Sequence, residues 1–574
     1  TSLRGPLEEG AVVLTANRRI RAKILEAYAA YKRECGEVSW TTPCVYSFEG
    51  WLSSQLERAA YIKGSQDFAD LILSDDRELA LWRQVISASK AEHGVINMTA
   101  AATDAAKAYR VSKLWMQDLQ SQDFDETDAT RSFADWAARF ESVCRALGAM
   151  PKCLTGEKVL SAYREGVLRP QSSIRLVGFD DIPPLHQALL DQACEELIAI
   201  DHQCVADNTN ELFCAPEPSD ELRAAAHWAR QIAQKDPEAV VGIIDPALGQ
   251  RRNQVFQTFM EVLDPHQQRH DINQYAPPFN ISMGEALNTF PLVQVAFAIW
   301  DLNRFRVSMD TIQRLLHTPL IGGYAHERQA RLKVWSRINK SRVSSMTTGQ
   351  LRDQMADAED LQARVDTVKS TVSDGSRRLP SEWSDILYHQ LTAAGWPGDY
   401  DLCSYEFQVG QMLLSILQEF ADYDPLTEHV SFSEALSIVH RLAGNRLFQP
   451  ETKDSTVQVL GSLEGAGLTF DYLWVVGMRS DQWPAAAAPT PYIPLHIQRE
   501  HEMPNATPER ELEFARSLTH RFATSARHVV FSYPASDGDN ELTASQLVSH
   551  LPHTDAQQLG IDGADSSLAW ASGE

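Results

Sequence analysis

Six short apolar runs constrain the fold of this chain more than any other feature of its sequence. Each run is rich in Val and Ile, and a helix-favouring pattern follows it. Strands that are buried on both faces of a parallel sheet show continuous apolar runs instead of alternation. We therefore predict an α/β fold built on parallel sheets. The runs are Ala11 to Thr15, Ile174 to Gly178, Ala239 to Asp245, Val457 to Gly461, Tyr472 to Gly477 and His528 to Tyr533.

Two long helix-favouring stretches separate these runs, so strands from distant segments must join one sheet. In particular, the run at 239–245 must pair with strands from 457–533. Each sheet would then carry a mostly helical insertion. The predicted domains are a first α/β domain at 1–60 and 166–205, a helical insertion at 61–165, a second α/β domain at 206–289 and 451–550, a larger helical insertion at 290–450, and a tail at 551–574.

The formal net charge of −25 argues against a protein that coats itself in nucleic acid. Binding responds to local potential, however, and two segments are basic. Segment 18–33 has six basic residues and one acid, and segment 301–350 has nine and three. The alternative for both is a solvated charged face. The candidate DNA-binding residues are Arg18, Arg19, Arg21, Arg328, Arg331, Lys333, Arg337 and Lys340, with Trp335 as a stacking aromatic.

The cysteines and the hydropathy pattern limit the class of protein. The eight cysteines are scattered and form no CxxC pair, so we expect reduced thiols and neither a metal site nor a cofactor. No apolar run approaches the roughly 18–20 residues that span a bilayer, and the N-terminal residues show no signal-peptide pattern. We therefore expect a cytoplasmic protein without a membrane partner.

The segment from Val457 to Pro484 is the most specific in the chain. It resembles the fifth motif of superfamily 1 helicases of the UvrD/RecB/AddA group. Polar positions of that motif are replaced here, with Gly461 for Thr, Leu463 for His, Ala466 for Lys and Thr469 for Glu. The resemblance implies two RecA-like domains, each with a helical insertion. The positions that are kept are Gly467, Leu468, Phe470, Asp471, Gly477, Trp483 and Pro484.

The residues after the first strand do not form a phosphate-binding loop. Such a loop needs glycines whose amides approach the phosphates, a Lys, and a Ser or Thr for magnesium. Here Ala16 and Asn17 lead directly into three arginines, and no glycine lies between Gly10 and Gly36. We therefore expect no ATP hydrolysis. Arg18, Arg19 and Arg21 would contact a DNA backbone or fill the vacated phosphate pocket.

The acidic helicase motif is also degenerate. In the alignment that keeps the Pro-Leu-His segment in place, Val177 and Gly178 stand where an Asp and a Glu belong. Asp180 and Asp181 follow in the turn. A metal contact by Asp180 stays possible, but a solvated turn or a cap on the next helix is favoured.

Together these features resemble AddB-like subunits of bacterial DNA end-processing complexes and related repair proteins near exodeoxyribonuclease V. Shorter runs at 14–24, 178–190, 279–287, 314–323 and 531–534 are similar to that family too. The degenerate motif positions are Asn17, Gly178, Asp180, Asp181, Gly467, Phe470, Asp471 and Trp483.

The resemblance implies a non-motor subunit for double-strand-break processing and recombinational repair. It would bind or scan single-stranded or end-bearing duplex DNA beside a UvrD/AddA-like helicase. The family also carries a RecB-type nuclease, but no Asp…Glu-x-Lys constellation is found before Glu574. We therefore expect this chain to be neither ATPase nor nuclease, with any nuclease domain beyond the tail. Two alternatives stay open, a protein scaffold without DNA contact and an ATP-dependent helicase with divergent motifs.

Overall fold

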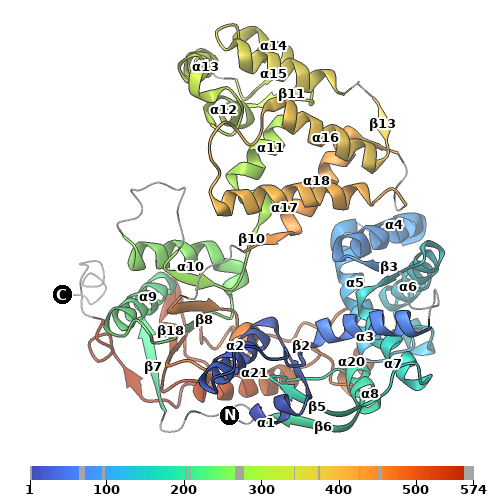
Figure 1. Ribbon diagram of the computed structural model, residues 1–574, viewed down its shortest axis with the longest axis vertical. Coiled ribbons are helices and arrows are strands. Elements are labelled where there is room, and N and C mark those ends of the chain that lie inside the picture. Colours follow the sequence, from blue (N-terminus) through green and yellow to red (C-terminus); the bar gives the residue numbers. More distant parts are fainter. Residues whose placement is uncertain are drawn as a thin grey trace. The chain divides into compact units, whose positions relative to one another are not determined.

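The chain forms two compact units in the computed structural model (Figure 1). The first comprises Thr1–Arg269, Pro277–Ser282 and Lys453–Glu574, and the second His270–Ala276 and Met283–Thr452. The two larger parallel sheets belong to the first unit, and the second unit is mostly helical. The structure describes residues 3–63, 71–93, 97–200, 205, 208–265, 277–341, 343–372, 375–425, 427, 429–449 and 455–561.

A four-stranded parallel sheet forms the N-terminal part of the first unit, in the order β2-β1-β5-β6. Its strands are β1 (Val12–Thr15), β2 (Val45–Ser47), β5 (Gln171–Val177) and β6 (Cys194–Ile200). One face packs on three helices and the other on two, so the central strand β1 is buried throughout. The first three are α3 (Phe48–Lys63), α7 (Thr155–Arg164) and α8 (Pro184–Ala193), and the other two are α1 (Arg4–Glu8) and α2 (Arg18–Glu34).

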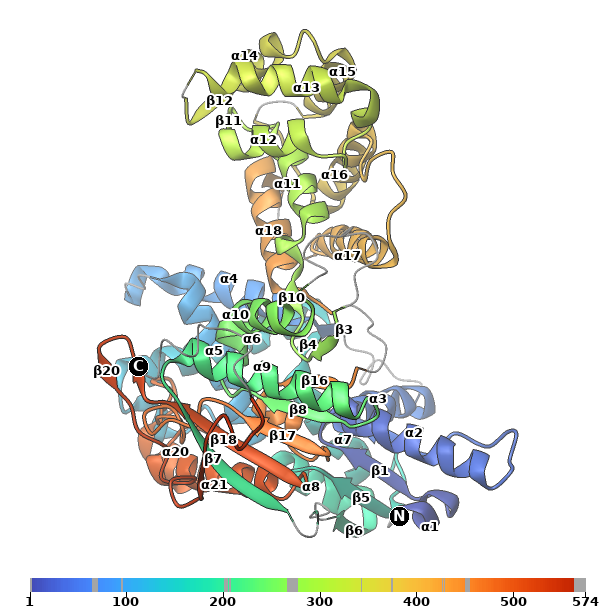
Figure 2. The same ribbon diagram turned by 90° about the vertical axis from the view of Figure 1, so that its left-hand side faces the viewer.

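A seven-stranded parallel sheet in the order β21-β7-β18-β17-β8-β16-β9 forms the rest of the core. Helices α9 (Pro218–Lys235) and α10 (Leu248–Leu263) lie on one face, and α21 (Pro508–Ala523) lies on the other (Figure 2). The strands are β7 (Thr209–Ala215), β8 (Val241–Ile244), β9 (Phe279–Ile281), β16 (Val457–Leu460), β17 (Tyr472–Val475), β18 (His528–Pro534) and β21 (His553–Thr554).

The predicted α/β class and all six predicted strands are confirmed. Strand β8 pairs with β16 on one side and β17 on the other, so the segments far apart in sequence do join one sheet. Every residue of β8 is buried because both faces of the sheet are covered. Strands β6 and β7 were not expected, since Glu interrupts their apolar pattern. β6 tolerates this at the sheet edge, where Glu195 and Glu196 are exposed.

The helical segment between β2 and β5 packs on its own aromatic cluster. Trp82 stacks on Phe140 with ring centroids 4.3 Å apart, and Tyr109 meets both rings edge-on. The segment also contacts the later part of the first unit, because the Trp115 indole N–H donates to the His501 carbonyl at 3.0 Å. Its main helices are α4 (Asp75–His93), α5 (Met98–Leu114) and α6 (Asp128–Leu147).

The second unit is a helical body with three short antiparallel strand pairs. Its helices are α11 (Pro291–Asp301), α12 (Met309–His317), α13 (Tyr324–Asn339), α14 (Thr348–Gln354), α15 (Glu359–Ser370), α16 (Pro380–Ala394), α17 (Ser404–Ala421) and α18 (Phe432–Asn445). Its strand pairs are β10 (Glu285–Ala286) with β15 (Leu447–Phe448), β11 (Arg306–Ser308) with β12 (Ser345–Thr347), and β13 (Arg377–Arg378) with β14 (Val430–Ser431). Within the described ranges of both units, no helix combines the length and the apolar composition needed to cross a bilayer.

Candidate functional site

The connection between β1 and α2, where a phosphate-binding loop was sought in the sequence, is only two residues long. Strand β1 ends at Thr15, and α2 begins at Arg18. The Asn17 side chain caps α2 by accepting from the Ile20 amide at 2.9 Å, and the Ala16 amide donates to the Val177 carbonyl at 3.1 Å. The amides of Ala16 and Ile20 are therefore engaged within the protein, and the two-residue connection is too short to wrap a glycine-rich loop around a phosphate.

The side chain of Ile20 fills the space beyond this connection. It is 4% exposed and belongs to the apolar core beneath the seven-stranded sheet, although α2 flanks the four-stranded one. Two glycines with left-handed backbone make room for it. A Cβ on Gly178 (φ +79°) would lie 2.6 Å from the Ile20 Cδ1 atom, and a Cβ on Gly467 (φ +82°) would lie 3.1 Å from it.

The arginines around Ile20 do not fill this space. Arg18 is exposed, and Arg19 is half-buried with Glu464 as its opposing charge. The Arg21 Nε atom donates to the Val45 carbonyl at 2.9 Å. Of the two expected roles for these arginines, filling the space after β1 is not seen, since the aliphatic side chain of Ile20 lies there.

Two ion pairs join the turn after β5 to α21, beside Ile20. The Arg521 Nε atom lies 2.9 Å from the Asp180 Oδ1 atom, and an Arg521 terminal nitrogen donates to the Phe179 carbonyl at 2.9 Å. Arg510 pairs with Asp181. Asp180 lies in an exposed bend, as the favoured interpretation expects, but its carboxylate is ion-paired, and the expected cap on α8 is not formed. Its side chain is 12% exposed, and α8 begins without a side-chain cap.

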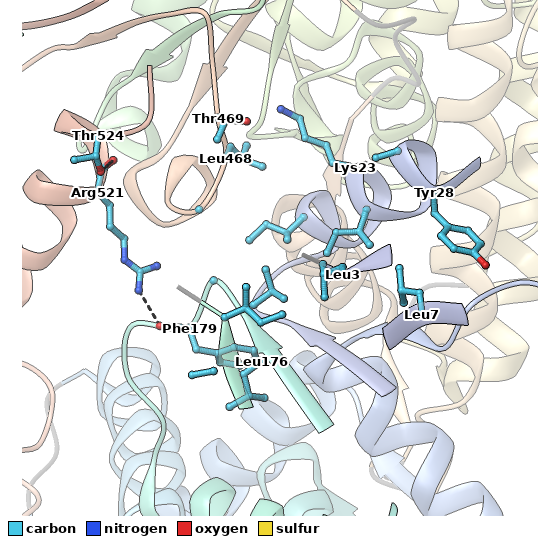
Figure 3. Close-up of a pocket in the computed structure, with 18 of the residues that line it drawn as sticks. Leu3, Leu7, Lys23, Tyr28, Leu176, Phe179, Leu468, Thr469, Arg521 and Thr524 are labelled. Carbon is cyan, nitrogen blue, oxygen red and sulfur yellow. Dashed lines mark hydrogen bonds between the residues drawn. The ribbon is translucent and has the colours of Figure 1, made fainter. Parts of the chain in front are cut away.

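A cleft of about 730 Å³ lies beside the Ile20 plug, between α2, the carboxyl ends of β5 and β6, and α21 (Figure 3). In parallel α/β sheets, ligands bind outside the carboxyl ends of the strands. The lining that the structure describes is apolar at its centre and contains no carboxylate. Its basic residues are Arg4, Lys23, His520 and Arg521.

Burial shapes the electrostatics of this cleft. It lowers the pKa of the Lys23 ammonium, mainly by desolvation, while Glu26 and Asp471 oppose the shift. The Lys23 Nζ atom lies 5.4 Å from the centre of the Phe470 ring, a cation–π contact. Figure 3 shows Lys23 directed towards the Leu468–Thr469 segment. The cleft thus presents basic groups around an apolar floor, without carboxylates placed to activate water.

The remaining positions of the degenerate motifs have packing roles. The Asp471 carboxylate accepts from the Val240 amide at 2.9 Å and so holds the start of β8 against β17. Phe470 packs so closely on Gly242 that a Cβ there would lie 2.7 Å from its ring. Trp483 is buried, and its indole N–H donates to the Thr519 hydroxyl at 2.9 Å.

The basic residues expected on one helix lie on α13 in the second unit, with different environments. Arg331 is fully buried, where it pairs with Glu327 and donates to the Gly322 carbonyl at 2.7 Å. Arg337 pairs with Asp357, and the half-buried Trp335 packs edge-on against His317. The exposed cations of this set are Arg328, Lys333, Lys340 and the ion-paired Arg337.

Sequence reasoning missed Ile20, Arg510 and Arg521. An isoleucine at helical spacing gives no signal beyond core packing, and both arginines lie on α21, more than 300 positions from the aspartates they bind. Among the described residues, no three His, Cys, Asp or Glu side chains are grouped to hold a metal ion. Comparison of the sequence with protein-family models and with curated proteins gave no match.

Proposed function

We propose that this chain is a helicase-like subunit that handles DNA without hydrolysing ATP. Its two parallel sheets would be RecA-like domains, and their helical insertions would correspond to those of superfamily 1 helicases. The chain would bind single-stranded DNA beside an active helicase during double-strand-break repair.

The Ile20 plug carries this proposal. In a motor, the space after the first strand holds nucleotide phosphates, and the domains move as the nucleotide turns over. Here Ile20 joins the core of the other sheet, and the Arg521–Asp180 ion pair spans the same junction. Closing the site with apolar and ionic contacts fits a protein whose two sheets stay together, since there is no nucleotide cycle to separate them.

The DNA-handling part of the proposal is supported by local positive charge. The protein as a whole is acidic, yet Arg328 and Lys333 on α13 and Lys340 just after it are exposed. Cations that face solvent can displace the counterions of a DNA backbone. We do not include Arg331, which is buried, or Arg337, which pairs with Asp357, among the proposed DNA contacts.

The absence of ATP turnover is the first expected result. With saturating oligo(dT), the protein is expected to release no phosphate above a protein-free control, because no Lys-Ser/Thr pair follows β1 and both Asp180 and Asp181 are ion-paired to α21. The same sample should bind oligo(dT), with a log Kd that rises linearly with log salt. An active superfamily 1 helicase serves as the positive control. Sustained ATP turnover would contradict the non-motor assignment, and salt-independent or absent binding would contradict the DNA-handling one.

The exposed cations of α13 give a second expected result. Lys333→Gln should weaken oligo(dT) binding and reduce the salt slope by about 0.7, the contribution of one single-strand phosphate contact. Lys369→Gln, on α15 in the same unit, is the matched control and should leave the slope unchanged. If the wild type and Lys333→Gln show the same salt slope, α13 is not part of the DNA-binding surface.

A further inference from the structure

A pocket of about 470 Å³ lies in the second unit, between the turn after α11 and the start of α18. Such a volume is in the range of small-ligand sites, roughly 300–1,000 Å³. On one side the lining is the run from Asn303 to Arg306, and on the other it is Ser431 to Ser433. None of the described lining residues carries a carboxylate, although the protein as a whole is strongly acidic.

Phe305 is the most exposed large side chain of this pocket. Its ring is 82% exposed, and an arginine stands on each side of it in the sequence. An exposed aromatic face beside positive charge is the arrangement with which proteins hold single-stranded nucleic acid: a base stacks on the ring, and the cations meet the phosphates.

The turn that presents Phe305 is fixed by hydrogen bonds. The Thr348 hydroxyl is placed to donate to the carbonyls of Leu302 and Arg304, at 3.2 and 3.3 Å. The Asn303 side chain donates to the Trp300 carbonyl at 3.0 Å, and Arg306 begins strand β11. Binding would cost little further conformational entropy, because the backbone on both sides of the ring is already held by hydrogen bonds.

Both arginines are anchored and keep donors for a ligand. The Arg304 Nε atom lies 2.5 Å from the Asp301 Oδ1 atom. The Arg306 Nε atom donates to the Ser345 hydroxyl at 2.9 Å, and one terminal nitrogen donates to the Ser345 carbonyl at 2.6 Å. A guanidinium group has five N–H donors, so each of these bonds leaves others that can meet a phosphate oxygen.

We propose that this pocket binds one unstacked base of single-stranded DNA on the Phe305 ring, with the adjoining phosphates on Arg304 and Arg306. The inference rests on the proposed DNA-handling function and identifies where the strand is held. Duplex DNA does not fit this role, since its bases are already stacked. The contact is sequence-tolerant, because every base has a π-face.

The test compares two exposed phenylalanines of the same unit in the full chain. Phe305→Ala is expected to weaken oligo(dT) binding about tenfold, equivalent to about 1.4 kcal/mol, and to leave the salt slope unchanged. Phe407→Ala is the matched control: Phe407 lies on α17, is 56% exposed and does not line the pocket. This control should bind like the wild type. Both variants should melt like the wild type, because each removed ring faces mostly solvent.

A strand of abasic sites separates stacking from charge, since it keeps the phosphates and lacks the bases. The wild type and Phe305→Ala should bind this strand equally, whereas Arg304→Gln should weaken binding to both strands and lower the salt slope. If the wild type binds oligo(dT) and Phe305→Ala binds it equally well, the stacking site is wrong and the proposed function stands. A loss of abasic-strand binding in Phe305→Ala would also overturn the stacking role. If the wild type binds neither strand, both proposals fail.

Discussion

Replacing Ile20 with Ala is expected to destabilise the junction between the two sheets by about 3 kcal/mol. Truncating a buried Ile or Leu to Ala generally costs about 2–5 kcal/mol, because the cavity left behind is only partly refilled. Relaxation around Ile20 is restricted, since Gly178 and Gly467 approach it with backbone and carry no side chain that could move into the space.

The expected measurement is hydrogen exchange of the junction, because a chain of two units need not unfold in one step. Amides of residues 176–179 and 466–470 should exchange about a hundredfold faster in Ile20→Ala, as about 3 kcal/mol implies. Ile62→Ala is the matched control, since Ile62 lies on α3 and is 52% exposed. That variant should exchange like the wild type at the same amides.

The Ile20→Ala variant also tests the proposed absence of ATP turnover. Ile20→Ala opens space where phosphates would sit, yet it should gain no ATP turnover, because Asn17 and the residues after it supply neither glycine amides nor a Lys-Ser/Thr pair. Exchange at wild-type rates would show that Ile20 does not hold the junction. New ATP hydrolysis would show that the plug alone suppressed a motor.

The fold could be predicted because its central strands are continuous apolar runs, which can be recognised in the sequence alone. Central strands such as β8 and β17 are apolar at every position, and that pattern depends only on both sheet faces being covered. Strand β7 escaped prediction because Glu211 interrupts its run. In the structure the Glu211 carboxylate accepts from the His528 Nε2 atom of the neighbouring strand at 3.0 Å. Such a cross-strand pair is visible only once the register is known.

Only those parts of the candidate site could be predicted in which the local chemistry demands a particular residue type. The absence of glycine after Thr15 excluded a phosphate loop without any structure. Which side chain fills the space after β1 depends on the rotation of α2 about its axis. Packing against the seven-stranded sheet sets this rotation. The burial of Arg331 has the same origin, since its partner Glu327 lies one turn earlier on the inner face of α13.

Replacing Arg521 with Ala is expected to cost about 2–3 kcal/mol near neutral pH. The Asp180 carboxylate, 12% exposed, would lose its counter-charge, and the Phe179 carbonyl would lose its donor. Breaking one partner of a buried pair costs more than the pair contributes, because a charge stays buried alone. Arg516→Ala is the matched control on the same helix: Arg516 pairs with Glu513 at the surface, where ion pairs contribute about 0–1 kcal/mol.

The loss of stability in Arg521→Ala should depend on pH, and the ionisation of Asp180 sets the direction of that dependence. Burial raises the pKa of this carboxyl above its ordinary value, and Arg521 opposes that shift. Without Arg521 the pKa rises further, so protonation relieves the buried charge at a higher pH. The stability of Arg521→Ala is then retained below the unfolded-state pKa near 3.8 and lost as pH rises through the folded-state pKa.

Thermal melts of Arg521→Ala and of the double variant Asp180→Asn/Arg521→Ala, taken from pH 8 down to about pH 4, measure this dependence. The neutral amide cannot ionise, so the double variant should be the more stable of the two at pH 8, and the gap should narrow on acidification. A constant gap would mean that the Asp180 charge is not the source of the deficit. Equal melts for Arg521→Ala and Arg516→Ala would mean that the bridge adds nothing to the junction. In that case Ile20 and the Arg510–Asp181 pair would hold the two sheets together.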